Sequence, residues 1–186
     1  MGYRYGQVMF GEATRKLQAE HGSGAQYGRM MAAPGSDGSE LGTAEMDFIG
    51  RRDSFYMASV TPDGWPYMQH RGGPKGFLRV IDPKTLAFAD FAGNKQYISA
   101  GNFAANDRVS LFLMDYPNQA RLKVIGHASA LEPGDDPLLD DDKSLHVPAY
   151  PARIERLIRI EIAAFDWNCS QHIRPRFTRE EWAAEK

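Results

Sequence analysis

The segment from Phe55 to Tyr116 constrains the fold most, because strand patterns follow one another there almost without a break. The runs 55–61 and 66–71 are rich in residues that strands favour, and they flank the tetrapeptide Pro62-Asp-Gly-Trp65. In that tetrapeptide proline presets one turn dihedral and glycine supplies a positive φ. The sequence therefore predicts a β-hairpin over these two runs.

A glycine-rich bend follows the hairpin. Gly72-Gly-Pro-Lys-Gly76 contains three glycines, which allow the backbone to come close to a flat ligand. A strand pattern resumes at Phe77 and continues to Ile81. We interpret this third strand as interrupted, with the interruption directly after Arg71.

The remaining elements can be assigned in the same way from apolar periodicity and turn residues. We expect helices over residues 11–20, 43–51 and 97–105, a short helix in the polar tail, and strands over 85–91, 108–114, 121–131 and 154–165. Thr43 is a candidate N-cap for the second helix. Six or seven antiparallel strands with short flanking helices predict a mainly β fold, a closed or split β-barrel.

Composition bounds the organisation of the chain. With 186 residues, of which 42% are hydrophobic, it can bury a core as one domain. We expect an N-terminal helical arm and loop over residues 1–42, the barrel domain over 43–178 and a C-terminal tail over 179–186. The acidic stretch 132–142 is expected to be a solvated loop, because it lacks the glycine and distal glutamate of a calcium site.

Charge and residue usage exclude several classes of function. A net charge of −2 argues against a general nucleic-acid binder, which needs a basic field. No run approaches the roughly 20 apolar residues of a membrane span. The single cysteine, Cys169, fits a reducing compartment, so we expect a soluble cytoplasmic protein. The histidines lack metal-ligand spacing, and no third group orients Cys169 and His172 as a catalytic pair, so no metal site is expected.

Several motifs in a fixed order carry a resemblance to a known family. They are Arg71–Phe77, Gly93-Asn-Lys-Gln96, the run 106–113, the run 122–128 and Trp167–His172. In this order the chain resembles the pyridoxamine 5′-phosphate oxidase family of FMN-binding split barrels, over about residues 48–177. The likeness is strongest to an oxidase-like branch whose substrates are unassigned.

The resemblance implies a homodimer that holds two FMN molecules in clefts between the subunits. By resemblance the FMN phosphate would lie at Asn94, Lys95 and Gln96. The chemistry agrees, since a phosphate monoester needs a cation, polar donors and the free amides of a helix start. From the residues alone, a plain polar turn remains the alternative.

The resemblance places the flavin ring at the glycine bend. Arg71 is the candidate cation near N1 and C2=O, and Gly73 is part of the bend that faces the ring. Phe77 and Leu78 would offer backbone hydrogen bonds and apolar packing, whereas the alternative for both is ordinary core.

Trp167, Gln171, His172 and Arg174 follow the last strand, where the family places residues that reach the partner subunit's FMN. Here the tail reads Gln-His-Ile-Arg-Pro-Arg176, which departs from the spacing of the biosynthetic oxidases. A role in vitamin B6 synthesis is therefore not expected.

The sequence thus predicts a homodimeric FMN-dependent oxidoreductase that moves a hydride between a small organic substrate and flavin N5. No catalytic residue is assigned. The alternatives are a flavin-binding module without turnover, and a split-barrel relative that uses haem or the deazaflavin F420.

Overall fold

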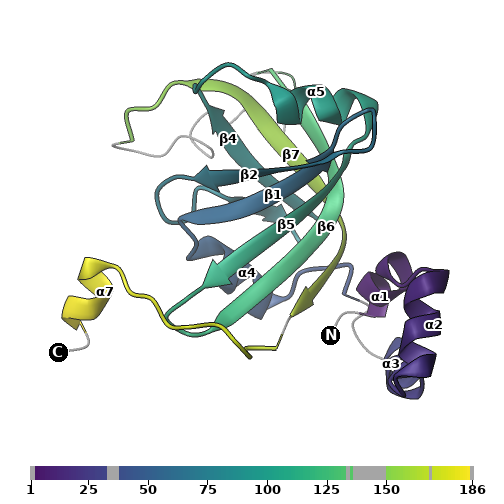
Figure 1. Cartoon of the computed structure of the whole chain (residues 1–186). Coiled ribbons are helices and arrows are strands. Elements are labelled where there is room, and N and C mark those ends of the chain that lie inside the picture. The colour runs from purple at the N-terminus through teal and green to yellow at the C-terminus, as the bar shows by residue number, and fades with distance from the viewer. Residues whose placement is uncertain (1–2, 33–37, 133–134, 136–149, 168, 185–186) are drawn as a thin grey trace.

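The computed structural model describes residues 3–32, 38–132, 135, 150–167 and 169–184. A seven-stranded antiparallel sheet with the order β2-β1-β5-β6-β7-β4-β3 forms the body of the protein (Figure 1). The sheet curls into a barrel that stays open between its edge strands β2 and β3, which confirms the predicted mainly β split barrel. The strands are β1 (Ser54–Val60), β2 (Pro66–Gly72), β3 (Arg79–Asp82), β4 (Thr85–Phe91), β5 (Arg108–Asp115), β6 (Ala120–Leu131) and β7 (Ile154–Trp167).

The core lies inside the curled sheet and follows strand alternation. In β5 every second residue from Val109 to Leu113 is buried, and the residues between them are partly exposed. In β7 the same alternation buries Ile158, Ile160 and Ile162. Because side chains on a strand alternate between faces, one apolar set from each strand fills the barrel.

The glycine bend differs from its prediction in one respect. The strand expected from Phe77 pairs only from Arg79, because Phe77 and Leu78 turn into the core ahead of it. The Phe77 ring stacks on Phe55 at a centroid distance of 5.6 Å. The predicted hairpin turn is confirmed, with Gly64 at φ 85°.

Two short helices lie against the barrel. Helix α4 (Thr43–Gly50) precedes β1, and α5 (Ile98–Ala105) covers one end of the barrel after β4 (Figure 1). The prediction that Thr43 caps α4 is wrong. Gly42 is the N-cap, and its amide donates to the Glu45 carboxylate at 2.9 Å, so the side chain that anchors this helix start is Glu45 and not a hydroxyl at the N-cap.

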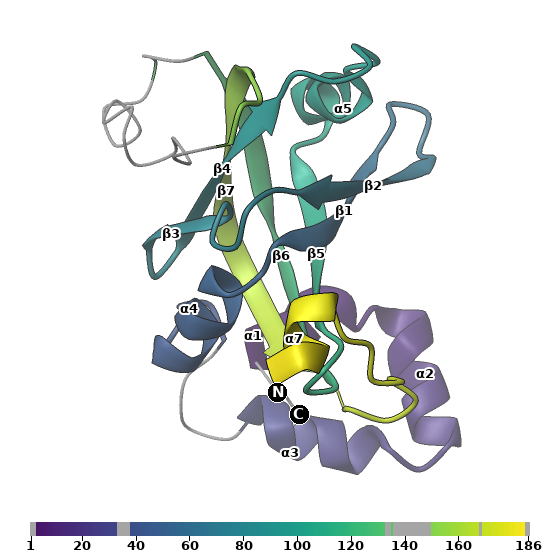
Figure 2. The ribbon, with the colours of Figure 1, turned by 90° about the vertical axis from the view of Figure 1, so that its left-hand side faces the viewer.

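Three further helices gather beside the barrel, and one lies in the tail (Figure 2). They are α1 (Tyr3–Met9), α2 (Glu12–Glu20), α3 (Gly24–Ala32) and α7 (Arg179–Ala184). The predicted helices α2 and α7 are confirmed, whereas α1 and α3 were not anticipated. Tyr5 of α1 is buried against Ile125 and Ala164, and its ring lies 4.4 Å from Lys123 Nζ. The division of the chain at residue 42 stays a prediction.

Two features are absent from the described residues. Within these residues there is no helix of the length and apolarity that a membrane crossing requires. Nor do three or more His, Cys, Asp or Glu side chains gather as metal ligands in the part of the chain that the structure describes. Most of the acidic stretch 132–142 lies outside the described residues.

Candidate functional site

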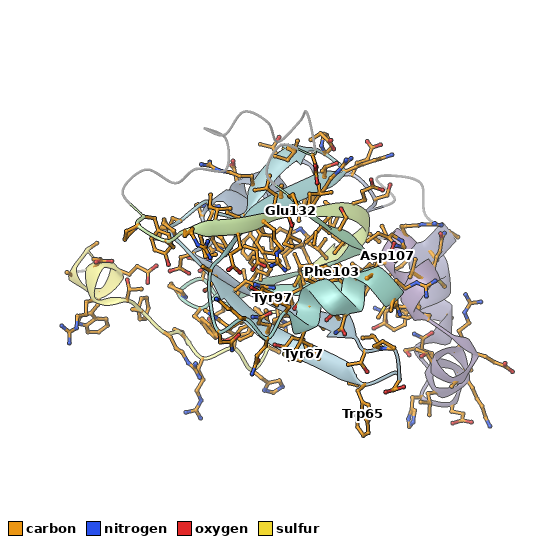
Figure 3. The ribbon with its side chains drawn as sticks, turned by 90° about the horizontal axis from the view of Figure 1, so that it is seen from above. Trp65, Tyr67, Tyr97, Phe103, Asp107 and Glu132 are labelled. Atoms are coloured by element: carbon orange, nitrogen blue, oxygen red, sulfur yellow. The ribbon has the colours of Figure 1, made fainter. Side chains whose placement is uncertain are left out.

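A polar groove lies at the α5 end of the barrel, where β2, β4 and β7 meet the β4–α5 loop. It brings together four of the residues predicted from sequence, namely Arg71, Asn94, Lys95 and Gln96. The same groove contains residues that sequence reasoning did not assign: Tyr67, Gln69, Asp90, Tyr97, Ser99, Glu155 and Arg156. Figure 3 shows Tyr97 beside the start of α5, with Tyr67 close to it.

The loop over residues 93–97 has an unusual backbone. Lys95 and Tyr97 both adopt left-handed conformations, with φ of 58° and 53°. Such conformations are uncommon for residues other than glycine and cluster at functional sites. The Asn94 side chain accepts a hydrogen bond from the Gln96 amide at 3.2 Å, which fixes the turn and leaves Lys95 exposed.

The loop is attached to a rigid support. Ser99 Oγ donates to Gln69 Oε1 at 2.9 Å, and Asn102 Nδ2 donates to Ser59 Oγ at 2.9 Å. Both bonds join α5 to the β1–β2 hairpin, and Ser99 and Asn102 are buried. Because buried polar groups that are fully paired specify one arrangement, these bonds hold the start of α5 against the hairpin.

Arg71 forms an ion pair with the carboxylate of Asp90. Its Nη1 lies 2.5 Å from Asp90 Oδ1, both side chains are mostly buried, and its guanidinium lies over the Phe88 ring at 5.6 Å. The sequence suggested Arg71 as a cation available to a ligand. In the structure the positive charge of Arg71 is instead largely neutralised by the Asp90 carboxylate.

Arg156 enters the groove from β7. Its guanidinium stacks on the Tyr97 ring at 4.6 Å, and its Nε lies 3.7 Å from Asp90 Oδ2. Arg156 has the same strand parity as the core residues Ile158 and Ile160, so it points to the inside of the barrel at its open end. Its parity with Ile158 and Ile160 can be read from the sequence, but it marks a groove residue only once the open end of the barrel is known.

The glycine bend serves packing within the protein. A Cβ on Gly73 would lie 2.8 Å from Cγ of Phe77, so glycine is required for Phe77 to enter the core. The Phe77 and Leu78 side chains belong to the main core cluster. The Gly73 and Phe77 amides already donate to the carbonyl oxygens of Asp53 and Pro74 at 2.9 Å, so these two N–H groups are not available to a ligand.

The tail residues lie far from the groove in the same subunit. Trp167 stands at the other end of β7, eleven positions beyond Arg156, which corresponds to about 36 Å at the usual rise per strand residue. Trp167 Nε1 donates to Glu45 Oε1 at 2.6 Å, and the ring packs edge-on against Phe48 at 4.8 Å. The Gln171, His172 and Arg174 side chains are exposed, and His172 has a φ of 65°. One subunit therefore does not bring the tail and the groove together.

A second hollow of about 390 Å³ lies between the start of β1, the β5–β6 hairpin and the tail. Arg176 lies over the Tyr116 ring at 5.0 Å, and Arg52 Nη2 contacts Asp115 Oδ2 at 2.8 Å. Burial raises the pKa of Asp115, but hydrogen bonds from Asn118 and the Arg52 charge outweigh it, so the net pKa is lowered. Asp115 is thus held as a carboxylate that neutralises Arg52.

The comparisons with known proteins fit this architecture. Residues 42–157, more than half of the chain, match the family model described as pyridoxamine 5′-phosphate oxidase. The chain belongs to this family. No curated protein matches the chain.

Among solved structures, the HupZ protein of Group A Streptococcus is 16% identical, with a TM-score of 0.55 over 74% of this chain and 100% of that one. A candidate pyridoxamine 5′-phosphate oxidase of Lactobacillus delbrueckii is 20% identical, with a TM-score of 0.52 over 69% of this chain and 94% of that one. At these identities the likeness shows the fold.

Proposed function

We propose that this member of the pyridoxamine 5′-phosphate oxidase family binds FMN in the groove and acts as a cytoplasmic oxidoreductase. The observation that carries the proposal is the exposed Lys95 on a strained loop at the start of α5, with Asn94 and Gln96 beside it. Cationic and polar groups at a helix start are suited to a phosphate monoester. The free, exposed thiol of Cys169 is compatible with the reducing cytoplasm.

The charges of the groove fit a phosphate-bearing ligand. Arg71, Lys95 and Arg156 carry three positive charges, against two negative charges on Asp90 and Glu155. Since the FMN phosphate carries about −1.5 to −2 charges at pH 7, the surplus cation favours its binding. The flavin ring would then extend from the loop along the bend at residues 71–78.

The bound flavin would supply the chemistry, by exchanging a hydride with a small organic substrate at N5. Backbone carbonyls of Gly73 and Phe77 and the backbone of Leu78 would hold the ring, because the Phe77 and Leu78 side chains are buried in the core and the Gly73 and Phe77 amides are already paired. Arg71, held by Asp90, would present a partly neutralised guanidinium near N1 and C2=O. No side chain is assigned to proton transfer.

A second copy of the chain would complete the site. The hollow in one subunit has a volume of only about 60 Å³, whereas small-molecule pockets usually enclose roughly 300–1,000 Å³. The outer face of β1, β2 and β5 carries an apolar surface formed by Tyr56, Met68, Phe112 and Met114. Pairing on that face would bring the partner's tail toward the groove, and with it the exposed Gln171, His172 or Arg174 of the partner subunit, whereas Trp167 is held by Glu45 and Phe48 in its own subunit.

The proposed phosphate corner consists of Asn94, Lys95 and Gln96, and its direct test is a binding titration of the Lys95→Ala variant with FMN. Loss of one charge-assisted hydrogen bond of about 1.5–3 kcal/mol should weaken FMN by about 10- to 100-fold. Lys16→Ala is the matched control, because it removes a lysine from α2, which lies away from the groove. Unchanged FMN affinity in Lys95→Ala would contradict the proposed phosphate site.

A further inference from the structure

Arg156 is a mostly buried cation whose guanidinium makes no hydrogen bond within the described part of the chain. Its side chain is only 16% exposed, yet it donates no hydrogen bond to any residue that the structure describes, and its Nε is buried without an acceptor. The nearest carboxylate oxygens, Asp90 Oδ2 and Glu155 Oε2, lie at 3.7 and 3.8 Å. Both separations exceed the range of a hydrogen bond.

The carboxylates near Arg156 already have other partners. Asp90 Oδ1 contacts Arg71 Nη1 at 2.5 Å, and Glu155 Oε1 accepts from Arg153 Nη2 at 3.0 Å. A guanidinium has five donors, and of those of Arg156 the buried Nε–H lacks an acceptor, which is unfavourable. Since the two carboxylates leave a surplus positive charge in the groove and the Arg156 Nε–H unpaired, the groove is suited to an additional acceptor.

Tyr97 fixes the direction of this cation. The guanidinium lies 4.6 Å from the centre of the Tyr97 ring, and the left-handed backbone of Tyr97 places that ring at the start of α5. Arg156 and Lys95 line the same groove although 61 positions separate them in the chain. The stack therefore orders a β7 side chain toward the ligand loop.

We propose that Arg156 binds the phosphate of the flavin, together with Lys95, and makes the groove selective for a terminal phosphate monoester. This inference rests on the proposed FMN-binding function. An arginine presents paired donors in a planar fork that matches two phosphate oxygens, which a lysine does not. Riboflavin, which has no phosphate, gains nothing from Arg156, and FAD offers a diester in place of the terminal oxygens.

The test compares FMN and riboflavin binding to the wild-type protein and to Arg156→Gln and Arg156→Lys, measured by quenching of flavin fluorescence. Arg156→Gln should weaken FMN by about 10- to 100-fold and change riboflavin by less than about threefold. Arg156→Lys should recover part of the FMN affinity, because it keeps the charge and loses the fork. Arg159→Gln is the control, since it removes a cation from the same strand outside the groove.

Riboflavin reports whether the groove remains intact in each variant. If Arg156→Gln weakens both flavins equally, Arg156 only supports the structure and the inference is overturned. If the wild-type protein binds FMN and Arg156→Gln binds it with the same affinity, this inference is overturned and the proposed function stands. Absence of FMN binding by the wild-type protein overturns the proposed function as well.

Discussion

Gly126 offers the strictest test of how the barrel is held together, because it lies where β6 and β7 change register between Ile125 and Gly126. A Cβ at this position would overlap the carbonyl oxygen of Glu161, and it would lie 3.1 Å from the Glu161 carbonyl carbon and 3.0 Å from Cγ2 of Ile160. Two of these atoms belong to the backbone of β7. A rotamer change therefore does not relieve the overlap, and β7 itself has to move.

Gly126→Ala should consequently lower the free energy of unfolding by about 3 kcal/mol or more, at the upper end of overpacking effects. For a protein of this size that corresponds to a fall in Tm of about 6–12 °C. Gly101→Ala is the matched control, since it lies inside α5 with no atom within 4 Å of the added Cβ, and it should stabilise by about 0.5–1 kcal/mol. Urea unfolding followed by circular dichroism measures both. A free energy of unfolding for Gly126→Ala within 1 kcal/mol of the wild-type value would refute the argument that β6 and β7 need glycine at this register shift.

Three further predictions concern assembly, activity and pH. In solution the flavin-loaded protein should be a dimer by light scattering, and a flavin-loaded monomer would remove the shared-cleft proposal. The FMN-loaded protein should turn over pyridoxamine 5′-phosphate with oxygen poorly, because its tail departs from the biosynthetic spacing; a kcat/KM of about 10⁴ M⁻¹s⁻¹ or more would contradict this. Asp115→Asn should cost about 1–3 kcal/mol at pH 7. Because the folded pKa of Asp115 is lowered, its stabilisation is present above the unfolded pKa of about 3.9 and is lost as pH falls through the folded value, so acid titration of both proteins should make their stabilities converge.

The barrel was predictable because its signals are local. The turn at Pro62–Trp65 and the alternation of β5 and β7 each depend on a few adjacent residues, and the structure has these elements within one or two positions. Helices α1 and α3 were missed, since neither is strongly apolar and the buried Tyr5 ring of α1 packs on distant strands. Thr43 was misassigned because the Glu45 carboxylate, by accepting from the Gly42 amide, can anchor a helix start whose N-cap has no hydroxyl.

The candidate site was only partly predictable, since it depends on contacts between strands. Lys95 and its neighbours could be found from their motif, but the pairing of Arg71 with Asp90 joins β2 to β4, which are not neighbours in the sheet and meet only because the sheet curls. Arg156 was missed because a charged residue at the start of a long apolar strand is usually solvated. Its inward parity becomes informative only once the strand's direction and the open end of the barrel are known.

The absorption spectrum of the purified protein, with identification of the released cofactor, tests the central claim most directly. We expect a yellow protein with the two near-visible bands of an oxidised flavin, which on denaturation releases FMN and not FAD, because the groove offers one phosphate corner. An intense Soret band, the single band of a deazaflavin, or released FAD would contradict FMN as the cofactor. A colourless protein with no affinity for added FMN would contradict flavin binding itself.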